Sequence, residues 1–268
     1  MKKQRFDPYS NYYYKLNKRK NRRAKLFTIL FVLFSISIVI FFSISFSNFL
    51  TVSKIVNINS NFIYEDKSVY ALSLDTSNNL SEAESKSESI KKQGGAGYIL
   101  NKGANEFKII SSIYLSEKDA KSVKENLENN GTICEIIKIN LPALNFKVSV
   151  TNKSSEILNN GISIFYSSYK KLYNLSVDYD SNKIDLVALK TSLNNLQSEN
   201  QKIIDKFNVK FNMSNNIYIL YVKIYLQRAN DIIKNLESLD ESVNFSSEIK
   251  YAYCNILNQY IDLYNEML

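Results

Sequence analysis

The sequence predicts an α+β fold: a membrane-spanning helix, then a βαββαβ unit in which two helices cover one face of a four-stranded antiparallel sheet, then an all-α bundle. Three observations predict it. Residues 26–50 carry no charge, two strand–helix–strand patterns follow within residues 69–140, and four long amphipathic patterns occupy residues 153–268. We therefore expect five regions: a basic tail (1–25), the membrane helix (26–50), a linker (51–67), the sheet domain (68–141) and a helical bundle (142–268).

The uncharged segment is long enough to be an uncleaved membrane anchor. A helix of that length reaches roughly 37 Å, and the hydrocarbon core of a bilayer is about 30 Å thick. Residues 1–25 contain ten Lys or Arg and one acid, Asp7, so the tail carries +9 while the whole chain carries +8. This asymmetry predicts a single-pass protein with a cytoplasmic N-terminus and residues 51–268 outside.

A cleaved signal peptide is the alternative for this segment. Its apolar core is normally about 7–15 residues long and precedes small residues at a cleavage site. The segment here is longer, and Ser47 to Val52 offer no such site. Because the positive charge lies in the tail and not on a folded surface, we expect no nucleic-acid partner.

Composition argues against most enzyme chemistry. The chain has no His, which removes His-activated nucleophiles and the commonest zinc ligand. Its two cysteines, Cys134 and Cys254, are far apart, and we expect buried free thiols rather than a disulfide. The acidic residues fall on polar helix faces and in turns. We therefore expect no enzyme activity and no cofactor or metal.

The pattern within residues 69–140 repeats strand, capping box, helix and glycine stop, which suggests a duplication. We expect strands at 69–74, 96–100, 106–115 and 132–139. Helices are expected after the capping boxes that begin at Ser81 and Ser116. In such a split unit both helices pack on one face of the sheet, and the other face is left open.

Residues 106–139 (EFKIISSIYLSEKDAKSVKENLENNGTICEIIKI) and the strand YALSLD near residue 70 resemble a SPOR domain, the sporulation-related repeat. Phe107 and Lys108 take the aromatic and basic positions of the family pattern. Ser112 takes a position where Gly is usual, and Tyr114 one where Phe is usual. The resemblance implies binding of peptidoglycan, notably of glycan strands stripped of stem peptides.

The sequence departs from this pattern at two positions that the family associates with the glycan-facing side. Ser73 stands where Gln is usual, and Ile110 replaces a polar residue. From strand alternation we expect the open face to carry the glycan-binding residues Ser73, Lys108, Ile110 and Ser112, with Tyr114 at the strand end. Each also fits an ordinary structural role, and for Tyr114 core packing is favoured.

Residues after Pro142 predict four amphipathic helices, at about 153–173, 182–207, 216–236 and 246–268, which suggests an antiparallel bundle. In the second helix the apolar residues fall in heptads and Asn200 takes an a-type position. An intermolecular coiled coil is the alternative to core packing. In the third helix the expected core stripe is Ile217, Leu220, Tyr221, Ile224, Ala229, Ile232, Ile233 and Leu236.

Two functions follow as expectations. The first is a membrane-anchored protein that binds peptidoglycan and is thereby placed where the wall is remodelled, at a division or sporulation septum. The second is a membrane-anchored scaffold whose bundle binds another envelope or divisome protein, with the sheet domain a divergent module that binds no glycan. The cytoplasmic membrane and peptidoglycan are thus the expected partners.

Overall fold

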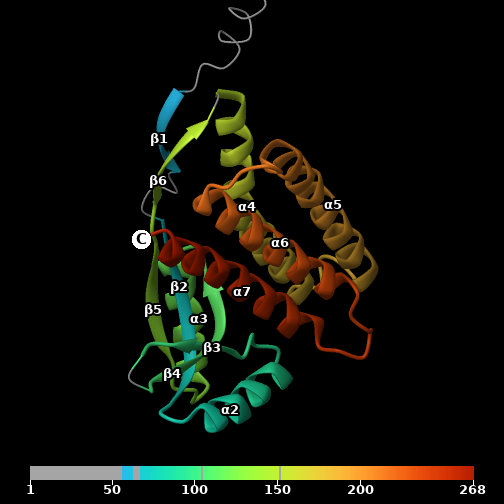
Figure 1. Ribbon diagram of the computed structural model, residues 1–268. Coiled ribbons are helices and arrows are strands. Elements are labelled where there is room, and N and C mark those ends of the chain that lie inside the picture. Colours follow the sequence, from blue (N-terminus) through green and yellow to red (C-terminus); the bar gives the residue numbers. More distant parts are fainter. Residues whose placement is uncertain (1–55, 63–66, 104, 151) are drawn as a thin grey trace, which may run out of the picture. The chain divides into compact units, whose positions relative to one another are not determined.

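The computed structural model describes residues 56–62, 67–103, 105–150 and 152–268 (Figure 1). The predicted membrane helix, residues 26–50, lies outside this part of the chain. None of the helices that are described is long and apolar enough to cross a membrane. The expected membrane helix and the expected single-pass location are therefore corrected: the structure supports neither.

The sheet has the predicted order of elements. Strand β2 (Lys67–Ser77), helix α2 (Leu80–Lys92), β3 (Tyr98–Asn101), β4 (Phe107–Tyr114), α3 (Glu117–Asn129) and β5 (Glu135–Leu141) follow one another. The strands lie in the order β3-β4-β2-β5, and every neighbouring pair is antiparallel. This is a split βαβ arrangement, in which the first and third strands form the centre of the sheet.

Local capping explains where the two helices of the sheet domain begin. Asn79 accepts hydrogen bonds from the backbone N–H groups of Ser81 and Glu82, so α2 begins one residue before the predicted capping box. Ser116 accepts from the N–H of Asp119, as the second capping box predicts. Such caps satisfy backbone donors that the first helical turn leaves without partners.

A second, two-stranded sheet was not predicted. Strand β1 (Val56–Phe62) pairs antiparallel with β6 (Leu144–Val150), and Figure 1 shows the two side by side. Part of the expected linker, residues 51–67, is therefore a strand, and so is the segment that leads into the bundle. The partners lie far apart in the sequence, so no local pattern indicated the pairing.

Four helices form close to the predicted positions in residues 152–268: α4 (Asn152–Asp180), α5 (Leu186–Phe211), α6 (Ile217–Glu237) and α7 (Phe245–Glu266). Consecutive helices contact one another, and α7 closes the bundle against α4. The heptad face of α5 packs inside this chain: Leu189 and Leu193 are buried, and Asn200 donates a hydrogen bond to Ser168 Oγ of α4 (2.8 Å). Core packing therefore accounts for the heptads.

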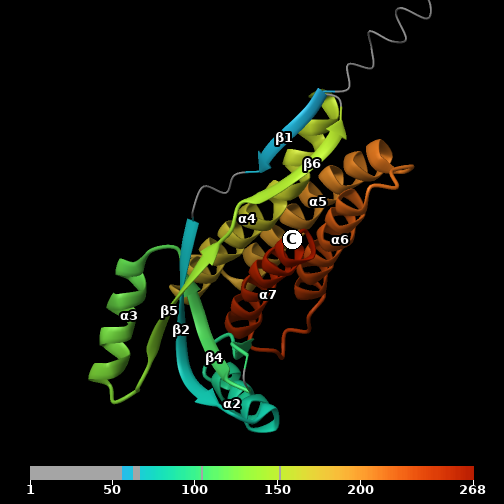
Figure 2. The ribbon, with the colours of Figure 1, turned by 60° about the vertical axis from the view of Figure 1, so that its left-hand side comes forward.

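The bundle covers the face of the sheet that was predicted to be open. Helices α2 and α3 contact one face, and α7 contacts strands β3 and β4 from the other (Figure 2). Ile109 belongs to a small cluster with Ala83 and Ile90 of α2. Ala71, Ile110 and other strand residues instead join the large apolar cluster that fills the bundle. Sheet and bundle thus share a core.

This shared core predicts that a truncation in the sheet destabilises the whole fold. Ile110→Ala removes a buried side chain from the large cluster and is expected to cost about 2–5 kcal/mol of unfolding free energy. Urea unfolding followed by circular dichroism measures it. Ile133→Ala is the matched control, because Ile133 is 87% exposed and its loss should change stability by about 0.5 kcal/mol or less. Equal effects would contradict the packing of the sheet on the bundle.

Candidate functional site

Three of the five predicted glycan-binding residues lie beneath the bundle. Ile110 is buried in the shared core. Ser112 is buried too, and its Oγ lies 2.7 Å from the hydroxyl of Tyr253 on α7. The ring of Tyr114 packs edge-on against that of Tyr173 on α4. The expectation of an open platform is therefore wrong at Ile110 and Ser112, whereas Tyr114 takes the core packing that was favoured for it.

Tyr253 is the centre of this contact. Its ring packs edge-on against Tyr169 and Tyr173 of α4, with centroids 5.7 and 6.1 Å away. Such aromatic pairs contribute about 0.5–1.5 kcal/mol beyond the burial of their area. A buried phenol also needs a hydrogen-bond partner, and Ser112 provides it. Burial raises the pKa of Tyr253 well above its ordinary value, so the phenol stays neutral.

A second contact joins the turn after α2 to the start of α7. The carbonyl oxygen of Gly94 accepts hydrogen bonds from Lys250 Nζ (2.8 Å) and Ser246 Oγ (3.2 Å). Lys250 also pairs with Asp180 of α4 at 2.6 Å. Because Gly94 has a φ of +86°, this turn uses a backbone conformation that glycine adopts without strain. The bundle thus holds the sheet domain at two separated places.

The two remaining predicted residues, Ser73 and Lys108, have polar contacts within the sheet. Ser73 is buried between two irregularities in the β2–β4 pairing, and its Oγ donates to the carbonyl of Asp75 (2.9 Å). Lys108 pairs with Glu106 (3.1 Å) and with Glu135 (2.8 Å). The bonds to Glu135 and Glu106 raise the pKa of Lys108, so it stays a cation.

A cavity of about 590 Å³ lies beside these residues, which we name the sheet-end cavity. It is lined by residues 73–76 of β2 and by residues 131–135, which connect α3 to β5. Its volume is within the range of about 300–1,000 Å³ that is typical of small-molecule sites. Of the five predicted residues, Ser73 alone lines it, and Lys108 contacts its wall through Glu135.

The polar groups of the sheet-end cavity are held in place by lysines. Asp75 Oδ1 lies 2.9 Å from Lys86 Nζ, and Glu135 Oε2 lies 2.8 Å from Lys108 Nζ. These ion pairs fix the orientation of both carboxylates. Each lysine also pairs with a second acid, Lys86 with Glu82 and Lys108 with Glu106. Ile133 lines the same cavity with 87% of its surface exposed, which is unusual for a large aliphatic side chain. Sequence reasoning missed the cavity, because it forms between segments far apart in the chain.

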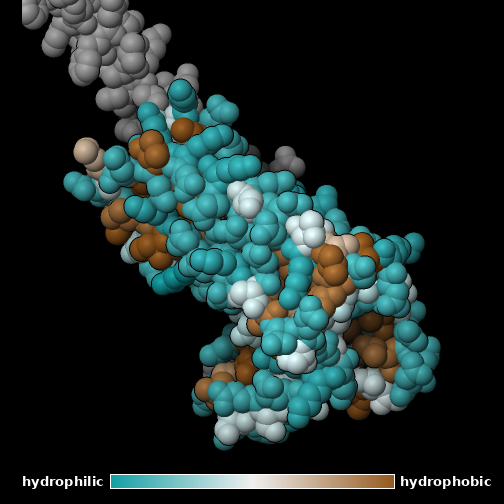
Figure 3. Space-filling view, turned by 90° about the vertical axis from the view of Figure 1, so that its right-hand side faces the viewer, coloured by the Kyte–Doolittle hydropathy of each residue, from teal (hydrophilic) through white to brown (hydrophobic). Residues whose placement is uncertain are grey.

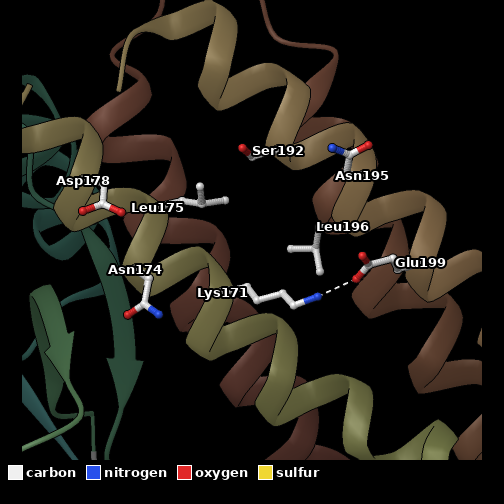
Figure 4. A pocket seen from close by; sticks show the side chains of 8 residues that line it. All are labelled: Lys171, Asn174, Leu175, Asp178, Ser192, Asn195, Leu196 and Glu199. Carbon is white, nitrogen blue, oxygen red and sulfur yellow. Dashed lines mark hydrogen bonds and ion pairs between the residues drawn. The ribbon is translucent and has the colours of Figure 1, made fainter. Parts of the chain in front are cut away.

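A second cavity, of about 310 Å³, lies between α4 and α5 (Figure 4). Lys171 and Glu199 form an ion pair across it, and Leu175 and Leu196 point into the space between the helices. The bond to Lys171 lowers the pKa of Glu199. Both charged side chains are exposed, and an exposed ion pair of this kind is common on helix surfaces. We assign this cavity no function.

Helix α6 exposes apolar side chains that the sequence placed in the core. Ile217, Leu220 and Ile224 are 50%, 38% and 46% exposed. The core side of α6 is formed instead by Ile219, Val222, Leu226, Ala229 and Ile233. Figure 3 shows that one face of the molecule carries apolar areas between hydrophilic side chains. The sequence-based stripe is therefore wrong for the first half of α6, which is apolar on two faces.

The described residues offer neither a metal-binding cluster nor a reactive thiol. They contain no group of three or more His, Cys, Asp or Glu side chains that could hold a metal ion. Cys134 and Cys254 are buried free thiols, as predicted. Burial raises the pKa of both, and a protonated thiol is a poor nucleophile.

No family model, curated protein or solved structure matches this chain. The resemblance of residues 69–140 to SPOR domains therefore stays a prediction.

Tyr253→Phe tests the contact between the bundle and the sheet. It leaves the ring packing in place but removes the hydrogen bond to the buried Ser112, which should cost about 1–3 kcal/mol of unfolding free energy. Urea unfolding measures the loss. Tyr70→Phe, at a partly exposed tyrosine of β2, is the control and should be close to neutral. A neutral Tyr253→Phe would count against the contact.

Alkaline pH tests the burial of Tyr114. Burial raises its pKa from 10.0 to about 12, so between these pH values the unfolded chain binds fewer protons than the folded one. Stability is therefore fully present below pH 10 and falls as the pH rises towards 12. Urea midpoints across this range measure the fall. Tyr114→Phe should make it shallower, without removing it, because burial also raises the pKa of Tyr98 and Tyr169. An unchanged slope would contradict the burial of Tyr114.

Proposed function

We propose that this chain is a non-catalytic glycan-binding protein whose sheet-end cavity binds sugar rings of peptidoglycan glycan strands. The observation that carries the proposal is the cavity itself, where two carboxylates held by lysines lie beside the exposed Ile133. The choice of polymer rests on the resemblance of residues 69–140 to SPOR domains.

The chemistry of the cavity suits a neutral, hydroxylated ligand. Among the described residues, Asp75 uses Oδ1 and Glu135 uses Oε2 for their lysines, so Oδ2 and Oε1 remain to accept bonds from sugar hydroxyls. The exposed Ile133 supports the proposal, because its side chain offers an apolar surface on which the C–H face of a sugar ring can pack.

This proposal moves the glycan site from the face of the sheet to its end. Ser73 remains in it as a lining residue, and Lys108 becomes a positioning residue that holds Glu135. Ile110, Ser112 and Tyr114 receive a packing role under the bundle. Binding without turnover would place the protein where glycan strands are accessible, such as a division or sporulation septum.

A second function, binding of another protein by the bundle, is favoured by one specific observation. Helix α6 presents Ile217, Leu220 and Ile224 to solvent although a separate set of side chains forms its core face. In that case the sheet domain would be a supporting module that binds no glycan.

Co-sedimentation of the full chain with purified sacculi, before and after amidase treatment, tests the glycan proposal. The basic tail, residues 1–25, will bind the anionic wall by charge alone, so binding is measured at high salt. The double variant Asp75→Asn/Glu135→Gln should lower the bound fraction at least about tenfold, because each good hydrogen bond to a charged group contributes about 1.5–3 kcal/mol.

Glu128→Gln is the matched control, since Glu128 is an exposed carboxylate of α3 that pairs with Lys124 outside the cavity. It should bind sacculi like the unaltered chain. Urea unfolding of all three proteins separates lost binding from lost folding. Equal sedimentation of the double variant and the control, or no high-salt binding by the unaltered chain, would overturn the proposal.

A further inference from the structure

The charged groups at the sheet-end cavity are unequal in number. Asp75 and Glu135 line it, and no Lys or Arg is among the described residues that do so. The two lysines that hold these carboxylates each pair with a second acid, at 2.8–3.1 Å for all four ion pairs. One cluster consists of Asp75, Glu82 and Lys86, and the other of Glu106, Lys108 and Glu135. Four carboxylates and two ammonium groups give the two clusters together a net charge of −2.

The helix ends beside the cavity leave this balance to the side chains. Residues 131–135 follow the C-terminus of α3, whose last turn has no basic residue. The β2 wall leads into the N-terminus of α2. A helix carries roughly half a negative charge at its C-terminus and half a positive charge at its N-terminus, so these two ends offset each other.

The nearby lysines do not restore neutrality at the cavity. Lys124 of α3, which adjoins Cys134, pairs with Glu128 (3.4 Å), and this pair adds no net charge. Two further lysines of the sheet domain, Lys102 and Lys138, do not line the cavity. A ligand in the cavity therefore meets a negative potential.

The two sugars of a peptidoglycan strand differ in charge. N-acetylglucosamine is neutral, and it alternates with N-acetylmuramic acid, which carries a lactyl ether on O3. The lactyl carboxyl is a free anion after the stem peptide is removed, and before removal it bears a peptide that has carboxylates of its own. Like charges brought together at a binding site repel each other, so a muramyl ring suits this cavity less well than its neutral neighbour.

We propose that the sheet-end cavity binds the N-acetylglucosamine rings of a glycan strand in preference to the muramyl rings. This inference rests on the proposed glycan function and names the sugar that the cavity selects. The ring hydroxyls and the acetamido N–H donate hydrogen bonds to the free carboxylate oxygens of Asp75 and Glu135. Because the two sugars alternate, every second ring is neutral whether or not stem peptides are present. Binding to a strand should therefore not require amidase treatment.

The test compares sugars that differ at one substituent, with the full chain labelled at its Ile methyl groups. Chitotetraose, an oligomer of N-acetylglucosamine without lactyl groups, should shift the methyl signal of Ile133 and leave that of Ile217 on α6 unchanged. At low salt, N-acetylglucosamine should bind at least about fivefold more tightly than N-acetylmuramic acid, because the excess charge is then least screened. The amide of N-acetylmuramic acid keeps the bulk but not the charge, and it should bind about as well as N-acetylglucosamine.

The double variant Glu82→Gln/Glu106→Gln removes the excess charge without changing a lining residue. It should narrow the preference for N-acetylglucosamine to about twofold or less, while the affinity for that sugar stays the same. Glu117→Gln/Glu199→Gln is the matched control, because it changes the net charge equally at two exposed carboxylates that pair with lysines elsewhere on α3 and α5. It should keep the full preference. Urea unfolding shows that each variant is folded.

The outcomes separate this inference from the proposed function. Equal binding of the two monosaccharides, or an unchanged preference in Glu82→Gln/Glu106→Gln, overturns the inference. If sacculi bind but chitotetraose does not, the inference fails and the glycan proposal stands. If sacculi do not bind and no sugar shifts the Ile133 signal, both fail.

Discussion

The packing of the sheet against the bundle is the constraint on which the rest of this structure depends. Strand residues such as Val69, Ala71 and Ile137 belong to the same apolar cluster as the interior of the four helices. With α2 and α3 alone, these side chains would face water, and each large one would lose about 1.5–3 kcal/mol of burial free energy. Neither half has a complete core without the other, so the two halves stabilise each other.

This packing decides where a ligand can bind. A platform on the face of the sheet would require the bundle to move away, which would expose the apolar side chains of β2, β4 and β5 and leave Tyr253 without its hydrogen bond to Ser112. Sites that remain accessible in the folded state lie at the end of the sheet and on the outer faces of the helices. The sheet-end cavity and α6 meet this condition without any rearrangement.

Features set by neighbouring residues could be predicted, and features set by distant ones could not. The cap at Ser116 and the heptads of α5 involve residues close together in the sequence, so the sequence pattern was sufficient to predict both helices. Strand β1 depends on a partner more than eighty residues away, and the burial of Ile110 depends on α7. In α6 two apolar stripes have helical spacing, and only the neighbouring helices decide which is buried.

Because sheet and bundle share one core, the two proposed sites belong to one cooperative unit and not to independently moving domains. Weak contacts at both would then reinforce each other. A protein held on a glycan strand presents the exposed apolar side chains of α6 to partners at the same place, at a raised effective concentration. Such linkage can increase apparent affinity by about 10²–10⁴ when the geometry allows both contacts. A divergent glycan site of modest affinity is therefore sufficient for localisation if α6 binds a partner that is itself present at the wall.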